Sequence, residues 1–289
     1  MKDGLKTKEA LRKESEAPLR KQNKNIPFPG WDALETERRQ QTPHIWLTIK
    51  DASGNVVRKI DGPVGKGFHR IAWDLKYPSV DAIRLDATST SSSGLMAAPG
   101  TYTASLSKQV DGVVTELSKP ISFTVEPLRP NALAGAAPVA VAEFWRQYEK
   151  DVRNSSALSL RLEHALKKIA AMEKALTQTA AAPGNLEKEM YAIRQELLEL
   201  NKQLNGDGPK QEVGEKSRPV ISQRLFAVSR SIYRSTYGPT ETARHGLEIA
   251  EAEIKDIDSK LTATTNKMKA VSNSLKEAGA PWVEGDFQN

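Results

Sequence analysis

The stretch GKGFHRIAWDLKYP, residues 65–78, brings two glycines, a lysine, a histidine and an aspartate together, as a phosphate-binding or catalytic segment would. Its Gly-x-Gly has no third glycine and no helical pattern after it, so it does not match the dinucleotide fingerprint. His69 and Asp74 are five residues apart on an expected strand, which puts their side chains on opposite faces. We therefore interpret the stretch as scaffold, with Trp73 in the core and His69 partly buried beside it.

Other patterns that carry chemistry do not occur in the sequence. Cysteine is absent, which excludes disulfides, thiol nucleophiles and Cys-ligated zinc. The histidines form no His-Glu-x-x-His motif or other i, i+4 pair, and there is no Gly-x-Ser-x-Gly elbow. Acidic residues of the helical segments stand among lysines, as on a solvated face. We expect no catalytic, metal-binding or cofactor-binding residues and no cofactor.

One connecting segment is denser in arginine, tyrosine and hydroxyl side chains than a connector requires. Residues 229–240 read SRSIYRSTYGPT and join two expected helices. Arginine and tyrosine are enriched where a protein surface is buried against a partner. On a continuing helix, four side chains would share one side and form a candidate interaction site: Arg230, Tyr233, Arg234 and Tyr237. The alternative is that the tyrosines only close the end of the helical domain.

The region that precedes these elements, residues 1–40, is polar and has a helical tendency. Two prolines and a glycine around Phe28 and Trp31 cannot continue a helix. The two aromatic residues are expected to anchor an extended segment onto a neighbour. Residues 1–40 are therefore predicted to be a partly helical linker.

From about residue 42 the apolar period changes to two, which is typical of half-buried strands. Ile45, Leu47 and Ile49 alternate with other residues, and turns with Gly or Pro separate the later strands. A strand is also expected over residues 68–75. Six or seven short strands at this spacing predict an Ig-like or fibronectin-like β-sandwich over residues 41–127. Its structural core is expected to include Trp73 and Tyr102.

After residue 127 the apolar period changes to 3.6, which predicts amphipathic helices. Four helices are expected, over residues 144–176, 186–204, 221–232 and 247–275. Short connections between such helices favour an antiparallel four-helix bundle over residues 128–289. The sequence therefore predicts a multi-domain α+β protein, in which a β-sandwich is followed by a bundle of long helices.

The charge of the chain narrows the range of partners. The net charge is +6, but residues 1–24 contain eight basic and four acidic residues, so most of the excess belongs to this end. Nucleic-acid binding needs Lys and Arg clustered on a folded surface, and we expect none. No apolar run approaches the ~20 residues that span a bilayer, and the start of the sequence lacks the apolar stretch of a signal peptide. By itself the sequence predicts a soluble chain without a membrane span, and it does not determine the localisation.

Several motifs resemble known bacterial modules. GFHRIAWDL, residues 67–75, followed by APGTYT, residues 98–103, resembles an Ig-like module of flagellar hook-capping proteins and secreted enzymes. A longer series of motifs is similar to the C-terminal region of large sialidase-like or sortilin-type proteins classed as glycosyl hydrolases. In chain order these motifs are LKTKEALRKESEA, PFPGW, WDLKYP, IYRSTYGPTETARHGLEIA and EAGAPW.

This resemblance implies an accessory role. The similar proteins have a β-propeller with neuraminidase repeats, then a β-sandwich and a helical tail, and they are typically periplasmic or extracellular. The repeat motif S-x-D-x-G-x-x-W does not occur in this sequence, so no catalytic acid carries over. The resemblance implies a non-catalytic region that positions or docks a propeller or a protein partner. The alternative is a glycan-binding sandwich module, for which Trp46 is the one spare tryptophan in the strands.

Overall fold

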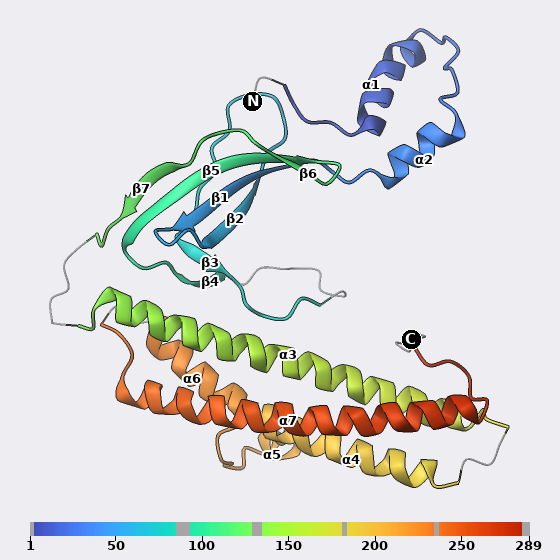
Figure 1. The fold of residues 1–289 in the computed structure, drawn as a ribbon, viewed down its shortest axis with the longest axis vertical. Helices are drawn as coiled ribbons and strands as arrows, with labels where there is room; N and C mark the ends of the chain where they lie inside the picture. The colour runs from blue at the N-terminus through green and yellow to red at the C-terminus, as the bar shows by residue number, and fades with distance from the viewer. Residues whose placement is uncertain (1–2, 85–92, 129–134, 181–183, 234–236, 285–289) are drawn as a thin grey trace. The chain divides into compact units, whose positions relative to one another are not determined.

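The computed structural model describes residues 3–84, 93–128, 135–180, 184–233 and 237–284 of the chain (Figure 1). The protein is mixed α+β, with about 52% of its residues in helices and 16% in strands. Its contacts define two compact units, which are described separately below. The first is Met1–Ser79 with Ser92–Pro130, and the second is Val80–Ser91 with Asn131–Asn289. The boundaries 1–40, 41–127 and 128–289 inferred from the sequence remain a prediction.

The first unit begins with two helices, α1 (Lys8–Lys21) and α2 (Trp31–Arg39), which hold each other through charges. The Arg12 guanidinium is bidentate to Glu37, with Nε–Oε1 and Nη2–Oε2 distances of 2.8 and 2.9 Å, and its Nη1 donates to Glu16 at 2.7 Å. Arg12 holds the pKa of the buried Glu16 carboxyl below its usual range. Trp31 is the first residue of α2, so it does not lie in the extended segment that we expected.

The main sheet of the first unit is antiparallel, in the order β2-β1-β5-β6, with β7 also paired to β5. A separate two-stranded sheet pairs β3 with β4. The strands are β1 (His44–Asp51), β2 (Val56–Gly62), β3 (Lys76–Pro78), β4 (Ser93–Met96), β5 (Gly100–Val110), β6 (Val113–Glu116) and β7 (Ile121–Val125). Asp111 and Gly112 both have positive φ, 49° and 79°, as a two-residue hairpin between β5 and β6 requires.

The strand expected over residues 68–75 does not form, so that prediction was wrong. Strand pairing starts only at Lys76, and Leu75 just before it has a φ of 58°, which no strand residue adopts. The alternation of Phe68, Ile71 and Trp73 suggested a strand. Alternation alone supplies no hydrogen-bonding partner, and among the described residues this segment has none in a ladder.

The core of the first unit is a cluster of apolar side chains from both sheets and from the segments next to β3 and β4. Ile49, Val57, Ala97 and Tyr102 are buried, with Leu47, Ile60, Trp73, Tyr77, Phe123 and Val125 packed around them. The Tyr102 hydroxyl donates to the Ala98 carbonyl at 2.6 Å, which satisfies the polar end of a ring that is 5% exposed.

The second unit is helical, and all four helices expected from the apolar period are present. They are α3 (Pro138–Leu176), α4 (Leu186–Asn205), α6 (Ile221–Tyr233) and α7 (Glu241–Glu277), with a short α5 (Gly208–Glu212) between α4 and α6. Their inward side chains follow the helical period, and the most deeply buried include Leu162, Ile169, Met172, Met190, Leu197, Leu204, Ile221 and Leu261.

The two longest helices, α3 and α7, run parallel to each other (Figure 1). Near the start of both, the Arg244 guanidinium lies 5.6 Å from the centre of the Phe144 ring. Further along both, Arg161 Nη1 pairs with Asp258 Oδ1 at 2.5 Å. The direction of these two helices differs from a simple up-and-down antiparallel bundle, in which neighbouring helices alternate.

The shorter helices α4 and α6 run against α7, one after the other. Glu196 early in α4 accepts from Lys267 late in α7, at 2.6 Å. Arg224 in α6 donates to Glu253, nearer the start of α7, at 3.3 Å. The chain thus fills one column beside α7 with two helices separated by a break.

In the second unit, the segment before residue 85 is fastened to α3. The Ala82 amide donates to Ser156 Oγ at 2.7 Å. The Arg84 guanidinium is bidentate to Glu163 at 2.8 and 3.0 Å, and Lys167 donates to the same carboxylate at 2.7 Å. The hydrogen bonds from Arg84 and then Lys167 hold the pKa of Glu163 at about 2.

We expect Arg84→Ala to raise the pKa of Glu163 from about 2 towards its ordinary 4.5, because Arg84 is the larger of its two stabilising partners. Lys167→Ala should raise it less. An NMR titration of the Glu163 side-chain carboxyl carbon measures both. A larger shift in Lys167→Ala than in Arg84→Ala would show that the Arg84 fork is not formed in solution.

Candidate functional site

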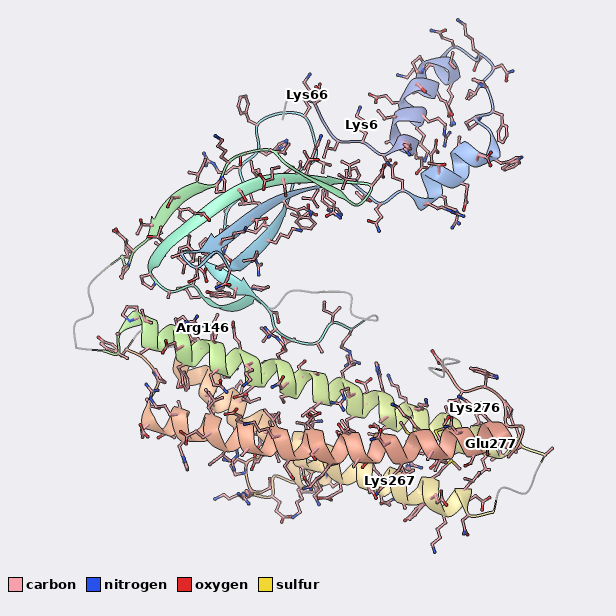
Figure 2. The ribbon with its side chains drawn as sticks, viewed as in Figure 1. Lys6, Lys66, Arg146, Lys267, Lys276 and Glu277 are labelled. Atoms are coloured by element: carbon pink, nitrogen blue, oxygen red, sulfur yellow. The ribbon has the colours of Figure 1, made fainter. Side chains whose placement is uncertain are left out.

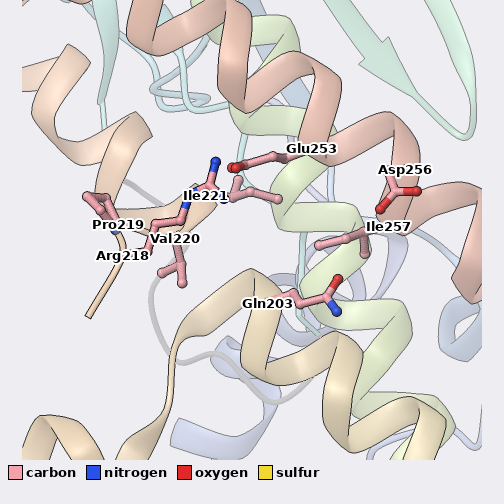
Figure 3. A pocket seen from close by; sticks show the side chains of 8 residues that line it. All are labelled: Gln203, Arg218, Pro219, Val220, Ile221, Glu253, Asp256 and Ile257. Carbon is pink, nitrogen blue, oxygen red and sulfur yellow. The ribbon is translucent and has the colours of Figure 1, made fainter.

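A pocket of about 220 Å³ lies where α4 ends, α6 begins and α7 passes both (Figure 3). It exists because the column beside α7 is broken: Gly206 leaves α4 with a φ of 100°, and Pro219 stands two residues before α6. The lining residues are Gln203, Arg218, Pro219, Val220, Ile221, Glu253, Asp256 and Ile257. The sequence predicted both helices but not this gap between them.

The pocket combines an apolar floor with charged walls. Ile221 and Ile257 form buried parts of its lining, at 1% and 2% exposure. Of its carboxylates, Glu253 accepts from Arg224 at 3.3 Å and Asp256 pairs with Lys260 on its own helix at 2.5 Å. The Arg218 guanidinium has no ion pair among the described residues. The arrangement can hold a small polar group, but its carboxylates are already paired with cations.

A second hollow, of about 540 Å³, follows the groove between α4 and α7 and shares Gln203 with the pocket. Paired side chains occupy its centre. Lys267, which Figure 2 labels on α7, and the Thr264 hydroxyl both donate to the Glu196 carboxylate. Lys267 and then Thr264 keep the pKa of Glu196 below its usual value. These polar side chains of the groove therefore satisfy one another.

The segment singled out from the sequence, residues 229–240, lies elsewhere in the helical unit. Helix α6 is described as far as Tyr233, and Tyr237 itself is not helical. Arg230 is exposed, and its guanidinium lies 5.7 Å from the Phe226 ring centre. The Tyr237 carbonyl accepts from the Ala136 amide at 2.8 Å. Tyr233's side chain and Arg234 lie outside the described residues.

These positions bear on the two interpretations of that segment. Tyr237 is 38% exposed and packs beside Gly135 and Ala136, just before α3. This contact joins the segment before α7 to the segment before α3, and it does not decide between the two interpretations. Whether Arg230, Tyr233, Arg234 and Tyr237 also bind a partner stays a prediction.

The residues of the glycine-rich stretch are not brought together. His69 is exposed and bonds the Gly65 carbonyl at 2.8 Å, so the expectation that it is partly buried was wrong. Asp74 accepts from the Lys76 amide at 3.1 Å, which fixes the turn into β3. The Trp73 indole donates to the Lys76 carbonyl at 3.0 Å. The polar side chains of His69, Trp73 and Asp74 thus form hydrogen bonds with backbone atoms of the same stretch.

Trp46, the candidate sugar platform, is engaged by its neighbours. Its indole NH donates to Gln109 at 2.8 Å, the Lys59 ammonium lies 4.4 Å from the ring centre, and the His44 ring stacks at 4.9 Å. A sugar ring would have to displace these contacts to stack on the indole.

In the helical unit, sequence reasoning missed the buried ionisable side chain of Asp151 in α3, which is 1% exposed. Burial, and secondarily the nearby Glu251 carboxylate, raises the pKa of Asp151 to about 6. The Gln147 side-chain amide donates to Asp151 Oδ2 over a long distance of 3.4 Å. The signal was present in the sequence, because Asp151 lies seven residues from both Phe144 and Leu158 in the apolar stripe of this helix.

Within the described residues, no cluster of three or more His, Asp or Glu side chains could hold a metal ion. In the same residues no helix is long and apolar enough to cross a membrane. The observed class is that of an α+β protein with a sheet unit and a helical unit. Comparisons with family models, with curated proteins and with solved structures find no match to this chain.

Proposed function

We propose that this chain is a non-catalytic accessory region of a sialidase-like β-propeller protein, which docks the propeller or holds it in position. The sheet unit is proposed to be an Ig-like sandwich. The helical unit is proposed to be a bundle of four helices in which α3 and α7 form two columns and α4 and α6 together form the third. The sequence motifs described above suggest the parent class. The exposed apolar edge of the main sheet supports the docking role.

One face of the sheet carries apolar side chains past the end of the core. Phe123 on β7 lies opposite Tyr102 on β5, in the core cluster. The same face continues along the edge through Ile121, opposite Ala104, then Leu117, whose amide bonds the Leu106 carbonyl, and Val113. These last three side chains are 69%, 47% and 66% exposed.

A row of exposed apolar side chains on an edge strand is uncommon in a surface that faces only water. Burying a fully exposed Val, Leu or Ile side chain is worth about 1.5–3 kcal/mol. Covering this edge would therefore contribute a few kcal/mol, which is enough to fix the orientation of an attached domain. This exposed edge is the observation on which the docking role depends.

The test starts from the genomic sequence next to this one, which we expect to encode a β-propeller. That propeller, produced separately, should bind this chain in calorimetry. Leu117→Lys with Ile121→Lys should weaken the binding roughly a hundredfold, because two charges would be buried at the contact. Val56→Lys is the matched control: Val56 is 57% exposed on β2, at the opposite edge of the sheet.

The proposal fails if no propeller is encoded nearby, or if the edge variant binds as well as the control. An assay of glycosidase activity is a second test of the proposal. The chain alone should hydrolyse no sialoside or chromogenic glycoside above buffer. Hydrolysis that a single Asp or Glu substitution abolishes would show an enzyme instead, and glycan binding lost in Trp46→Ala would favour the sugar-binding alternative.

A further inference from the structure

The turn that joins α1 to α2, residues 22–31, exposes two large aromatic side chains. We call it the aromatic tip. Phe28 is 60% exposed and Trp31 is 77% exposed, and their rings touch edge to face at 5.0 Å between centres. Apart from this mutual contact, both side chains remain largely exposed within the described part of the chain. Neither ring contributes to the sheet core described above.

The aromatic tip and its flanks carry a net positive charge. Residues 17–32 contain one acidic residue, Asp32 beside Trp31, and three basic residues, Arg20, Lys21 and Lys24. All three are exposed, and Lys21 and Lys24 form no ion pair within the part of the chain that the structure describes. The surroundings of the aromatic pair therefore carry a net positive charge, and α1 as a whole contains five basic and three acidic residues.

The aromatic tip is held in shape by the backbone and by the ion pairs behind it. Asn23 adopts the left-handed region with a φ of 48°, and the Lys24 amide donates to the Leu19 carbonyl at 2.9 Å. Pro27 and Pro29 restrict the backbone on both sides of Phe28. The partly buried, bidentate Arg12–Glu37 ion pair joins the two helices. Little conformational freedom is left to lose on binding, which favours affinity.

We propose that the aromatic tip binds the surface of an anionic lipid bilayer. Tryptophan and phenylalanine insert at the boundary between headgroups and acyl chains, where an indole keeps its NH hydrated. Lysines beside them are attracted to anionic headgroups. A bilayer deforms around a protruding pair of rings, whereas a protein partner would need a pocket shaped for both. The charge of the aromatic tip thus complements a lipid surface that carries negative charge.

The experiment is co-sedimentation of the full chain with vesicles of phosphatidylcholine alone, or of phosphatidylcholine mixed with phosphatidylglycerol. The chain should bind only the mixed vesicles, and added salt should weaken the binding. Phe28→Ala with Trp31→Ala should weaken it by roughly an order of magnitude or more, because the inserted apolar surface is lost. Lys21→Ala with Lys24→Ala should weaken it by roughly an order of magnitude.

The matched control removes another exposed phenylalanine and another exposed tryptophan elsewhere in the chain. Phe226 and Trp282 are 61% and 58% exposed, and Phe226→Ala with Trp282→Ala should bind the mixed vesicles as the wild type does. Because Phe28 and Trp31 are exposed, their variant should keep the wild-type melting curve. Quenching of Trp31 fluorescence by brominated lipid, lost in Trp31→Phe, places the ring in the bilayer.

Three results would overturn the proposal. The first is the absence of wild-type binding to the mixed vesicles. The second is binding that depends on the lysines but not on Phe28 and Trp31, which would show a diffuse electrostatic attraction. The third is that the Phe28 and Trp31 variant still binds vesicles but no longer binds the separately produced propeller. The aromatic tip would then be a protein contact. None of these outcomes depends on the sheet edge tested above.

Discussion

Asp151→Asn is expected to raise the free energy of unfolding of the helical unit by about 3 kcal/mol at neutral pH. The Asp151 carboxyl is 1% exposed, and burial raises its pKa from 3.8 to about 6. Each pKa unit corresponds to about 1.4 kcal/mol of preference for the neutral form in the folded state. Above pH 7 the folded protein must hold this carboxylate ionised, and asparagine removes that penalty while keeping a side chain of similar shape.

The direction of the pH dependence follows from the raised pKa. Below pH 3.8 the carboxyl is protonated in both folded and unfolded chains, so it contributes no difference. As the pH rises from 3.8 to about 6 the unfolded chain loses this proton first, and stability falls through that window. The wild type should therefore be less stable than Asp151→Asn by a growing margin across it, and by a constant margin above it.

Chemical denaturation followed by far-UV circular dichroism, at a series of pH values, measures this margin. Asp256→Asn is the matched control, because the Asp256 side chain is 56% exposed and pairs with Lys260 on its own helix. An exposed substitution of this kind should change stability by less than about 0.5 kcal/mol. If Asp151→Asn were no more stable than the wild type at pH 7, Asp151 would have a compensating partner in solution.

Trp73→Ala is expected to destabilise the sheet unit by about 3 kcal/mol, the lower end of the range for a core tryptophan, because Trp73 is only partly buried. Its ring contacts Tyr102 at 5.3 Å and Phe123 at 6.2 Å between centres, both edge to face. Its indole also donates to the Lys76 carbonyl. Removing it would leave a gap between the main sheet and the segment that crosses its face.

Thermal unfolding followed by near-UV circular dichroism measures this loss, because the near-UV signal reports the packing of the aromatic cluster. Trp73→Phe should recover part of the stability, since it restores ring packing without the hydrogen bond. Trp282→Ala is the control, because that ring is 58% exposed and lies 5.3 Å from the Lys276 ammonium. An unchanged melting curve in Trp73→Ala would mean that Trp73 does not belong to the core of the sheet unit.

The helices were predictable because their signal is local. In α4, Met190, Ile193, Leu197, Leu200 and Leu204 follow a 3.6-residue period that a strand does not show, and all five are buried. Turns were equally local: Asp111 and Gly112 have the positive φ values that their residue types allow at low cost. In these places a few neighbouring residues determine the conformation.

The segment with Trp73 shows where local pattern failed. Phe68, Ile71 and Trp73 alternate like a strand, yet strand formation depends on an unpaired neighbour at hydrogen-bonding distance. In the main sheet β1 and β5 are paired on both sides, and β2, β6 and β7 are edge strands to which this segment does not pair. The sequence does not show whether an alternating segment will meet the edge of another strand.

The sequence by itself determined the change from a strand period to a helix period, the positions of the long helices, and the absence of thiol chemistry. Only the tertiary structure decided that α3 and α7 run parallel, that the break between α4 and α6 leaves a pocket, and that Asp151 is buried. The apolar period of a helix states which side faces inward, but not which helix it meets or in which direction. Those choices depend on packing among side chains distant in sequence, and the candidate pocket and the raised pKa of Asp151 follow from them.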